Sequence, residues 1–391
     1  MIRIVLYLAA LTALAIAAVV ALLVIGAFLD PTASLWGVAG SAVWAPFGPF
    51  LLLAVLLALA IGLAARRYGP RRLGMAVLVL AIPALLGSAF ILGRIASAAI
   101  AAGATVDLPA TLMPARMDAP APDVVQRFRR VGPTDLQAAI YLPPPSTAPS
   151  PILAYIHGGG FMTGSFTETA ADLRWFADQG WLVASFEYRL FGPGRPTWGQ
   201  APEDVACALV WLARNAARLG GDPSRIALMG DSAGGNLAVN LGHAAAAGRA
   251  PAACGADVPV PAAIAVLYPA LDPTSIYEKG YPVPGFEPAT LIEGYIGGPP
   301  QDHPDRIAAI TSAGFLTADA PPTLIVLPEN DSLVVAEGTR AYAEAALRVG
   351  ADVTLVTIPF ASHVFNQIAA NSLGNQIGRS LRLRFLRQHA D

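Results

Sequence analysis

The chain has 391 residues, of which 55% are hydrophobic and 13% charged, and its formal net charge is −2. Soluble domains carry about 25% charged residues, so the composition argues against a wholly soluble or a disordered chain. The charge is also uneven, because residues 1–101 hold only six basic and one acidic side chain, out of 25 and 27 in the whole chain. The remainder is therefore acidic, and we expect no nucleic-acid partner for it.

Three charge-free runs fill the first quarter of the chain: Ile4–Leu29, Pro31–Ala65 and Leu73–Gly93. Each has the roughly 20 apolar residues needed to cross a bilayer core, and the spanning part of the second is expected near Trp44–Ala65. The first run could instead be a cleaved signal peptide, but it is long for one and two more spans follow. The sequence therefore predicts a membrane region with three transmembrane helices over residues 1–101.

The basic residues of this region set its expected orientation in the bilayer. Arg66, Arg67, Arg71 and Arg72 lie between the second and third spans, whereas the loop around Asp30 has no basic residue. Basic loops stay in the cytoplasm. Because three spans then cross the bilayer, we expect everything after residue 101 to lie on the extracytoplasmic side.

The chain has only two cysteines, Cys207 and Cys254. They show no metal-ligand spacing, so we expect no metal site. They could pair in an oxidising compartment. However, Cys207 lies in the helix-like apolar stretch Val205–Leu212, where a buried free thiol is the commoner outcome. The sequence favours the free thiol and leaves the disulfide open.

Residues 102–134 are interpreted as a linker and the start of a domain, because Asp107–Pro122 holds four prolines and suits an extended segment. Residues 135–391 alternate short β-rich runs with helix-like stretches, of which Pro202–Leu219 and Gly235–Ala247 are the clearest, so an α/β domain is expected. Continuous apolar runs predict a mostly parallel sheet. The strands expected are Gln137–Leu142, Ile152–Ile156, Leu182–Phe186, Ile226–Met229, Ala263–Leu267, Thr323–Leu327 and Val353–Ile358.

The sharpest motif is Gly-Asp-Ser-Ala-Gly at residues 230–234, between a predicted strand and a predicted helix. A sharp strand-to-helix turn can hold a serine in a strained conformation with its hydroxyl exposed, as in a nucleophile elbow. The flanking glycines let other backbone segments approach that turn closely. Because the pattern alone is weak, this context makes Ser232 the candidate nucleophile.

A second motif, His157-Gly158-Gly159-Gly160, directly follows the predicted strand Ile152–Ile156. Acyl transfer through a tetrahedral intermediate needs backbone N–H donors aimed at the developing oxyanion. Consecutive glycines can turn such amides into a cleft. A mobile glycine turn is the alternative, but a position about 75 residues before Ser232 favours the oxyanion-binding loop.

A serine nucleophile needs a base that a carboxylate orients. Of the five histidines, His363 follows the strand Val353–Ile358, at the strand end where parallel sheets place their sites. The other four lie in the glycine loop, on the helix after Ser232, in a proline-rich connection and in the terminal tail: His157, His243, His303 and His389.

Asp331, after the strand Thr323–Leu327, is the preferred acid, with Glu329 and Asp272 as rivals. The order of nucleophile, acid and base along the chain is then that of an α/β-hydrolase.

With these motifs, residues 135–390 resemble the α/β-hydrolase superfamily, in the branch of esterases and lipases similar to hormone-sensitive lipase. Two structural motifs add to the resemblance: Glu187-Tyr188-Arg189-Leu190, similar to the family's Asp-Tyr-Arg-Leu, and a helix containing Glu203-Asp204-Val205. The resemblance implies the α/β-hydrolase fold, loop-shaping roles for His157 and Asp231, and no metal or organic cofactor. It also implies an oxyanion hole made by the amides of Gly158, Gly159, Gly160 and Ala233.

The stretch 271–320 between two core strands is too long for a simple loop. Its aromatic residues, Tyr277, Tyr281, Phe286 and Tyr295, suggest a lid over an apolar acyl pocket. The alternative is a surface excursion packed on itself.

We therefore expect a membrane-anchored serine hydrolase that cleaves small-molecule or lipid carboxylic esters through an acyl-enzyme. An acyltransferase or deacylase acting on an envelope lipid or polysaccharide is the alternative reaction for the same site. A non-enzymatic binding module on a hydrolase fold is disfavoured, because serine, histidine, acid and glycine loop are all intact.

Overall fold

A computed structural model describes residues 2–250 and 253–390 of the chain. The chain forms two compact units. The first contains the residues up to Ala115 together with residues 328–332 and 358–377, and the second contains residues 116–327, 333–357 and those from Gly378 on. The first unit thus combines the N-terminal helices with two short segments from far along the sequence.

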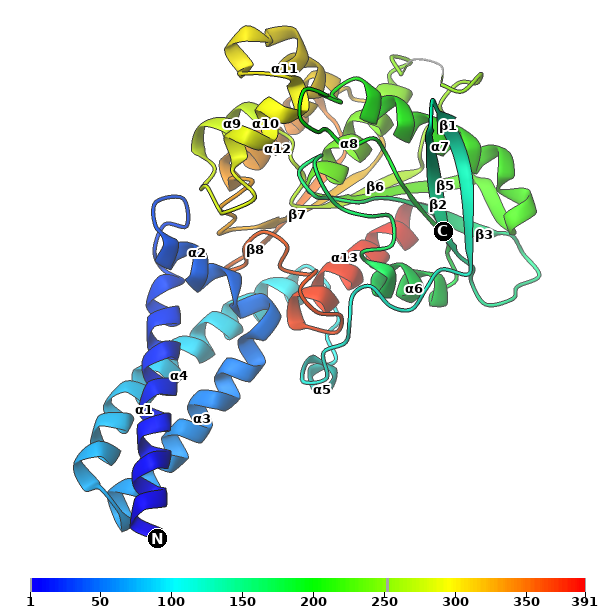
Figure 1. Ribbon diagram of the computed structural model, residues 1–391. Coiled ribbons are helices and arrows are strands. Elements are labelled where there is room, and N and C mark those ends of the chain that lie inside the picture. The colour runs from blue at the N-terminus through cyan, green and yellow to red at the C-terminus, as the bar shows by residue number, and fades with distance from the viewer. Residues whose placement is uncertain (1, 251–252, 391) are drawn as a thin grey trace. The chain divides into compact units, whose positions relative to one another are not determined.

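Helices α1 (Ile2–Gly26), α3 (Trp44–Tyr68) and α4 (Arg71–Ala101) are each long and apolar enough to cross a membrane (Figure 1). They correspond to the three predicted spans, although α4 continues to Ala101 instead of ending near residue 93. A short helix, α2 (Leu35–Ala42), precedes α3, and the Ser34 hydroxyl caps it by accepting a hydrogen bond from the Gly37 N–H.

Small residues line the faces on which these helices pack, spaced three or four apart as one helix face requires. A Cβ added at Gly62 of α3 would lie 2.9 Å from a methyl carbon of Val77 on α4. A Cβ added at Gly74 of α4 would lie 2.5 Å from the backbone nitrogen of Arg66 on α3. Such close backbone approach is typical of helices that pack within a membrane. The buried small residues include Ala10, Ala13, Ala17, Ala58, Ala65, Ala81, Ala84 and Ser88.

The second unit is built on an eight-stranded sheet in the order β1-β2-β4-β3-β5-β6-β7-β8. The first two strands pair antiparallel, β2 also pairs antiparallel with β4, and the pairs from β4 through to β7 are parallel. The predicted mostly parallel α/β architecture is therefore confirmed. The strands are β1 (Val124–Val131), β2 (Thr134–Tyr141), β3 (Ser150–Ile156), β4 (Leu182–Phe186), β5 (Gly221–Asp231), β6 (Ala263–Leu267), β7 (Thr323–Pro328) and β8 (Val353–Ile358).

Residues 102–134, expected as a linker and the start of the domain, contain two regular elements. A short helix, α5 (Leu108–Thr111), lies within the proline-rich stretch, and β1 forms an edge strand that the sequence did not predict. Edge strands commonly carry charged residues, and the arginines of β1 hide its strand pattern. One of them, Arg129, donates hydrogen bonds to Glu203 and Asp204, at 2.6 Å each.

Helices cover both faces of the sheet (Figure 1). Ile152, Ala154 and Ile156 of β3 point into a core shared with α7 (Gln200–Asn215) and α8 (Ala233–Ala246). On the other face, Tyr155 and Arg382 of α13 (Leu373–Ala390) both hydrogen-bond to the same buried carboxylate, that of Asp231. Two more helices complete the layers: α6 (Ala170–Asp178) and α12 (Ala336–Val349).

The insertion between β6 and β7 is helical. It contains α9 (Pro273–Lys279), α10 (Pro288–Ile296) and α11 (Pro304–Ile310), with 3₁₀ turns at Pro300–Asp302 and Ser312–Phe315. The insertion expected at 271–320 therefore consists of short helices and 3₁₀ turns.

Cys207 of α7 is bonded to Cys254, in the connection that follows α8, and their Cα atoms lie 5.3 Å apart. The expectation of a free thiol at Cys207 was wrong. Burial of Cys207 is compatible with a free thiol and with a disulfide. The bond is revealed only by the position of Cys254 beside it in the folded chain.

Removing this disulfide should lower the free energy of unfolding, because the bond closes a chain segment with a sequence separation of 47. Chain entropy puts the loss at about 4 kcal/mol at most. Thermal unfolding of a Cys207→Ala/Cys254→Ala variant measures it. Dithiothreitol should lower the Tm of the parent but leave that of the variant unchanged; a parent insensitive to reduction would contradict the bond.

His243 of α8 is buried between two hydroxyl groups. The Thr323 hydroxyl donates to Pro321 O, so it accepts from His243 Nε2 at 3.0 Å, and Nδ1 is left to accept from Tyr342 OH at 3.3 Å. This arrangement suits a neutral ring, and burial lowers the pKa of His243 from its ordinary value of 6.5 to about 4.

The free energy of unfolding should therefore fall as the pH is lowered from about 6.5 to about 4. In that window the unfolded chain binds a proton at residue 243 that the folded chain does not, which costs up to about 1.4 kcal/mol per pH unit. Denaturant unfolding across the window should give a smaller slope for His243→Gln than for the parent. The control His303→Gln, in a surface connection, should keep the parent slope; equal slopes in all three proteins would refute the assignment.

Candidate active site

Ser232 occupies a strained turn between β5 and α8, with φ 54° and ψ −120°. Non-glycine residues adopt this conformation rarely and only where the surrounding structure holds it. Here the Ser232 N–H donates to Leu267 O at 3.0 Å, while its carbonyl accepts from the N–H groups of Asn236 and Ala270, each at 3.1 Å. The strained turn predicted for a nucleophile elbow is present.

Close backbone contact makes glycine necessary at residue 234. A Cβ there would lie 2.1 Å from Ile156 O and 2.4 Å from His157 O, so any larger residue would push α8 away from the end of β3. The neighbouring Asp231 carboxylate accepts hydrogen bonds from Tyr155 OH, at 3.1 Å, and from Arg382 Nη1, at 2.9 Å. Asp231 therefore anchors the base of the turn.

The glycine loop runs directly beside this turn. A Cβ added at Gly158 would lie 3.4 Å from Ser232 Cβ, and Gly159 has φ +106° with Thr163 O only 2.1 Å from where its Cβ would be. Ala233 is the first residue of α8, so its N–H has no acceptor within the helix and lies at the positive end of the helix dipole. Both predicted sources of oxyanion-binding amides are thus adjacent to Ser232.

His157 and Tyr188 brace this loop from behind. Their rings stack with centroids 4.4 Å apart, and Tyr188 OH donates to His157 O at 2.9 Å. His157 Nδ1 lies 2.8 Å from Gly158 O and therefore carries the proton it donates there. Burial lowers the pKa of His157 to about 4, so the ring is neutral near pH 7.

The insertion packs on the front of the loop. Phe161, in a left-handed conformation with φ +60°, stacks on Tyr295 of α10 with ring centroids 3.7 Å apart. A Cβ added at Gly160 would lie 2.9 Å from a methyl carbon of Leu291, also on α10. The sequence analysis named Tyr295 as part of an aromatic lid. It did not predict Phe161 as its partner, because nothing local links Phe161 to an aromatic residue so far along the chain.

Asp331 and His363 form a hydrogen-bonded pair in the first unit. His363 Nδ1 lies 2.7 Å from Asp331 Oδ2, the aspartate side chain is fully buried, and 12% of the histidine side chain is exposed. An ionised carboxylate can only accept, so Nδ1 carries the proton that it donates to Asp331. Backbone hydrogen bonds of 2.9 Å, Glu329 N–H to Ile358 O and Asn330 N–H to Ala361 O, tie the two loops together.

Asp272, His303 and His389 make contacts of their own elsewhere. Asp272 caps α9 by accepting from the Ser275 N–H at 3.1 Å. His303 Nε2 lies 3.2 Å from Gly297 O, and the His389 ring lies against Phe385. His243 is buried within α8, against Thr323 and Tyr342. The pair that sequence reasoning preferred, Asp331 and His363, is joined by a hydrogen bond.

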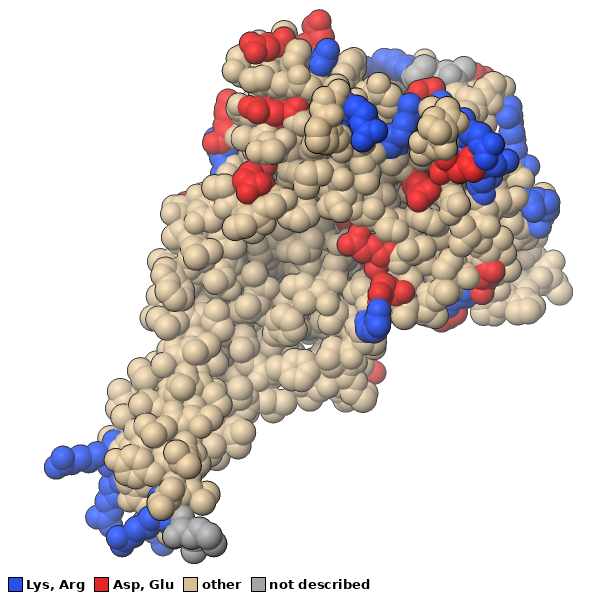
Figure 2. All heavy atoms as spheres, viewed as in Figure 1, with Lys and Arg blue, Asp and Glu red and all other residues tan. Residues whose placement is uncertain are grey.

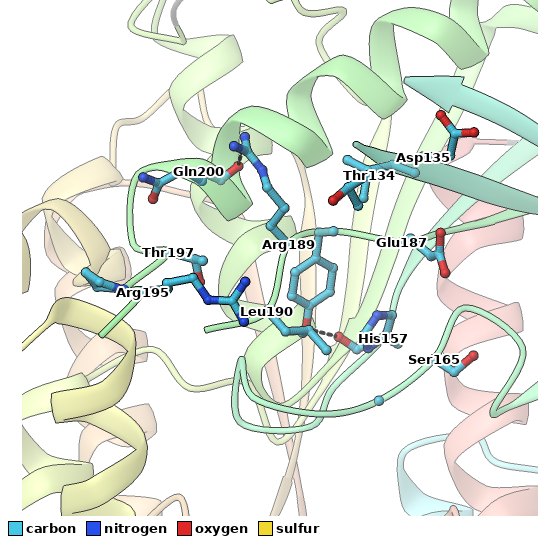
Figure 3. A pocket seen from close by; sticks show the side chains of 14 residues that line it. Thr134, Asp135, His157, Ser165, Glu187, Arg189, Leu190, Arg195, Thr197 and Gln200 are labelled. Atoms are coloured by element: carbon cyan, nitrogen blue, oxygen red, sulfur yellow. Dashed lines mark hydrogen bonds between the residues drawn. The ribbon is translucent and has the colours of Figure 1, made fainter. Parts of the chain in front are cut away.

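A cavity of about 680 Å³ lies behind the glycine loop (Figure 3). His157 and Tyr188 line it, and the Arg195 guanidinium points into it. Ser232 is not among the described residues that line this cavity. We therefore assign the cavity no part in the chemistry. Its other lining residues include Asp135, Ser165, Glu187, Arg189, Thr197 and Gln200.

Parts of the chain are similar in sequence to proteins named as ester hydrolases. It is 40% identical to the carboxylesterase NlhH of Mycobacterium tuberculosis over 116 residues, which cover 29% of this chain and 35% of that protein. It is 29% identical to an ethyl acetate hydrolase of Pseudomonas putida over 267 residues, which cover 65% of this chain and 79% of that one. The match thus spans only about a third of NlhH.

A solved structure and a protein family agree on the fold. The apo form of Thermogutta terrifontis esterase 2 superposes with a TM-score of 0.57 at 24% identity, covering 70% of this chain and 97% of that one. The family described as having the alpha/beta hydrolase fold matches residues 153–367, more than half of the chain and the stretch that holds both glycine motifs, Asp331 and His363. The chain therefore belongs to the α/β-hydrolase fold family.

Proposed function

We propose that the chain is a membrane-anchored carboxylic ester hydrolase in which Ser232, His363 and Asp331 act together. The observation that carries this proposal is the strained Ser232 turn lying against the glycine loop. The sheet supports the rest, because β5 and β7 are both parallel to β6 and so end at the same edge. Sites of α/β sheets form at that edge, and the loops carrying Asp331 and His363 follow β7 and β8.

In the proposed reaction, Ser232 Oγ attacks the ester carbonyl carbon while His363 Nε2 takes the hydroxyl proton. The carbonyl oxygen becomes an oxyanion and accepts hydrogen bonds from amides of Gly158–Gly160 and Ala233. Collapse of this intermediate breaks the ester C–O bond, and the leaving alcohol receives the proton from His363. Asp331 keeps the imidazole oriented and stabilises its charged form.

The second half of the reaction regenerates the enzyme. A water molecule gives its proton to His363 Nε2 and attacks the acyl carbon. A second tetrahedral intermediate then releases the carboxylic acid, and the proton returns to Ser232 Oγ. No step needs a metal ion or an organic cofactor.

The substrate we propose is a small-molecule or lipid ester with an apolar acyl part. Phe161, Leu291 and Tyr295 give the glycine loop an apolar wall, and such walls bind acyl groups by the hydrophobic effect. The names of the relatives, a carboxylesterase and an ethyl acetate hydrolase, support carboxylic esters as the class.

We further propose that α1, α3 and α4 anchor the protein with the catalytic residues outside the cytoplasm. Figure 2 shows the arginines of the α3–α4 turn as a blue group at one end of an otherwise largely tan helical surface. Arg66 and Arg67 end α3, and Arg71 and Arg72 begin α4. The disulfide between Cys207 and Cys254 suits an oxidising compartment on the opposite side.

Replacing Ser232 by alanine should abolish hydrolysis of p-nitrophenyl acetate and butyrate, because the attacking oxygen is lost. The expected fall in kcat is roughly a millionfold, unless the uncatalysed hydrolysis in buffer sets a higher lower limit for the measured rate. Ser224→Ala, at a serine of the same strand, is the matched control and should keep parent activity. A fluorophosphonate probe should label the parent and Ser224→Ala but not Ser232→Ala; labelling of all three would refute the assignment.

A reporter fused after the last residue should reveal the side of the membrane. Alkaline phosphatase, which is active only outside the cytoplasm, should be active in this fusion, whereas a green fluorescent protein that matures only in the cytoplasm should stay dark. The reverse pattern would overturn the proposed topology but not the proposed chemistry.

A further inference from the structure

The loop that carries Asp331 is attached to the end of the first membrane helix. The side chain of Asn330, the residue before Asp331, donates from Nδ2 to Ala27 O at 3.3 Å. Ala27 directly follows α1 and is buried. Because the acceptor is a backbone carbonyl, the contact depends on where α1 ends and not on the side chain there.

The loop that carries His363 is attached to the same helices by an aromatic cluster. The ring of Phe360, three residues before His363, lies 5.2 Å from the Phe28 ring and 6.2 Å from the Phe90 ring, centroid to centroid. Phe28 and Phe90 lie 6.1 Å apart, so all three rings touch. Edge-to-face pairs at these distances are favourable, and they hold Phe360 in a backbone conformation, φ +55°, that phenylalanine rarely adopts.

The segment after His363 is held by the chain just beyond α4. Gln376 Nε2 donates to Asp107 O at 3.1 Å, and Gln376 Oε1 accepts from the Asp107 N–H at 2.6 Å. Ala115 and Ala370 form an isolated antiparallel bridge with N–H to O distances of 3.0 Å in both directions. The histidine loop is therefore attached to the N-terminal region on both sides of His363.

We propose that the N-terminal helices position the Asp331–His363 pair and are therefore part of the active enzyme as well as its anchor. Asn330 and Phe360 are the positioning residues on the loops. Their counterparts are Phe28, in the turn after α1, and Phe90 of α4. This proposal rests on the proposed function, because the positioned pair is the acid and base of that reaction. A displacement of about 1 Å in such a pair is enough to lower a rate about a hundredfold.

The test compares Phe28→Ala with Phe50→Ala in the full chain, reconstituted in lipid nanodiscs. Phe50 is an exposed phenylalanine of α3, and among the described residues it makes no ring contact with either loop. We expect Phe28→Ala to lower kcat for p-nitrophenyl butyrate about tenfold or more, with KM within about twofold, because the base is misplaced while the substrate wall is intact. Phe28→Leu, which refills most of the volume, should recover most of the loss.

Asn330→Ala gives a second variant that leaves the aromatic cluster in place. It removes one hydrogen bond, so it should lower kcat by a smaller factor, and combined with Phe28→Ala it should lower kcat further than either change alone. If Phe28→Ala and Asn330→Ala both keep the kcat of Phe50→Ala, the proposal is overturned.

Hydrogen–deuterium exchange gives a readout that does not depend on activity. Phe28→Ala should speed amide exchange in residues 328–332 and 358–367, because contacts that suppress local opening are lost, whereas Phe50→Ala should leave these segments as in the parent. Unchanged exchange in Phe28→Ala would refute positioning, whatever the activity. A parent without Ser232-dependent hydrolysis would instead refute the proposed function, and the exchange data would still decide whether the helices hold the loops.

Discussion

The site depends on one close contact, the approach of the α8 backbone to the end of β3. A Cβ at Gly234 would lie 2.1 Å from Ile156 O, so a side chain there would separate the two elements. Because they meet, the strained Ser232 turn, the free amide end of α8 and the loop beginning at Gly158 occupy one small volume. The fold stabilises this arrangement from below, where Asp231 is held by a tyrosine and a buried arginine.

The sequence predicted those elements whose conformation is determined by residues close together in the chain. The buried strands β3 to β7 contain continuous apolar runs, the three long helices contain long charge-free runs, and both glycine motifs lie where a strand ends. Asp331 and His363 were chosen because each follows a predicted strand. In the structure His363 Nδ1 lies 2.7 Å from Asp331 Oδ2. In each case a short stretch of chain contains the physical reason for its own conformation.

Features whose cause is distant in the chain were missed. Arg129 of strand β1 pairs with acids of α7, Cys207 bonds to Cys254 in the connection after α8, and Phe161 stacks on Tyr295 of the insertion. The contacts of Asn330 and Phe360 with the N-terminal helices belong to the same class. No periodicity or spacing reveals such pairs, because each partner looks ordinary in its own segment.

The length of α4 has a consequence for how the enzyme responds to its lipid surroundings. Thirty-one helical residues extend about 46 Å, well beyond the roughly 30 Å of a bilayer core. In the anchored enzyme that we propose, this helix would therefore have to tilt or protrude. Membranes of different thickness change the tilt of such helices. Phe90 would move with the helix and Phe360 with Phe90, so a positioning role for these rings would make turnover sensitive to acyl-chain length and sterol content of the host membrane.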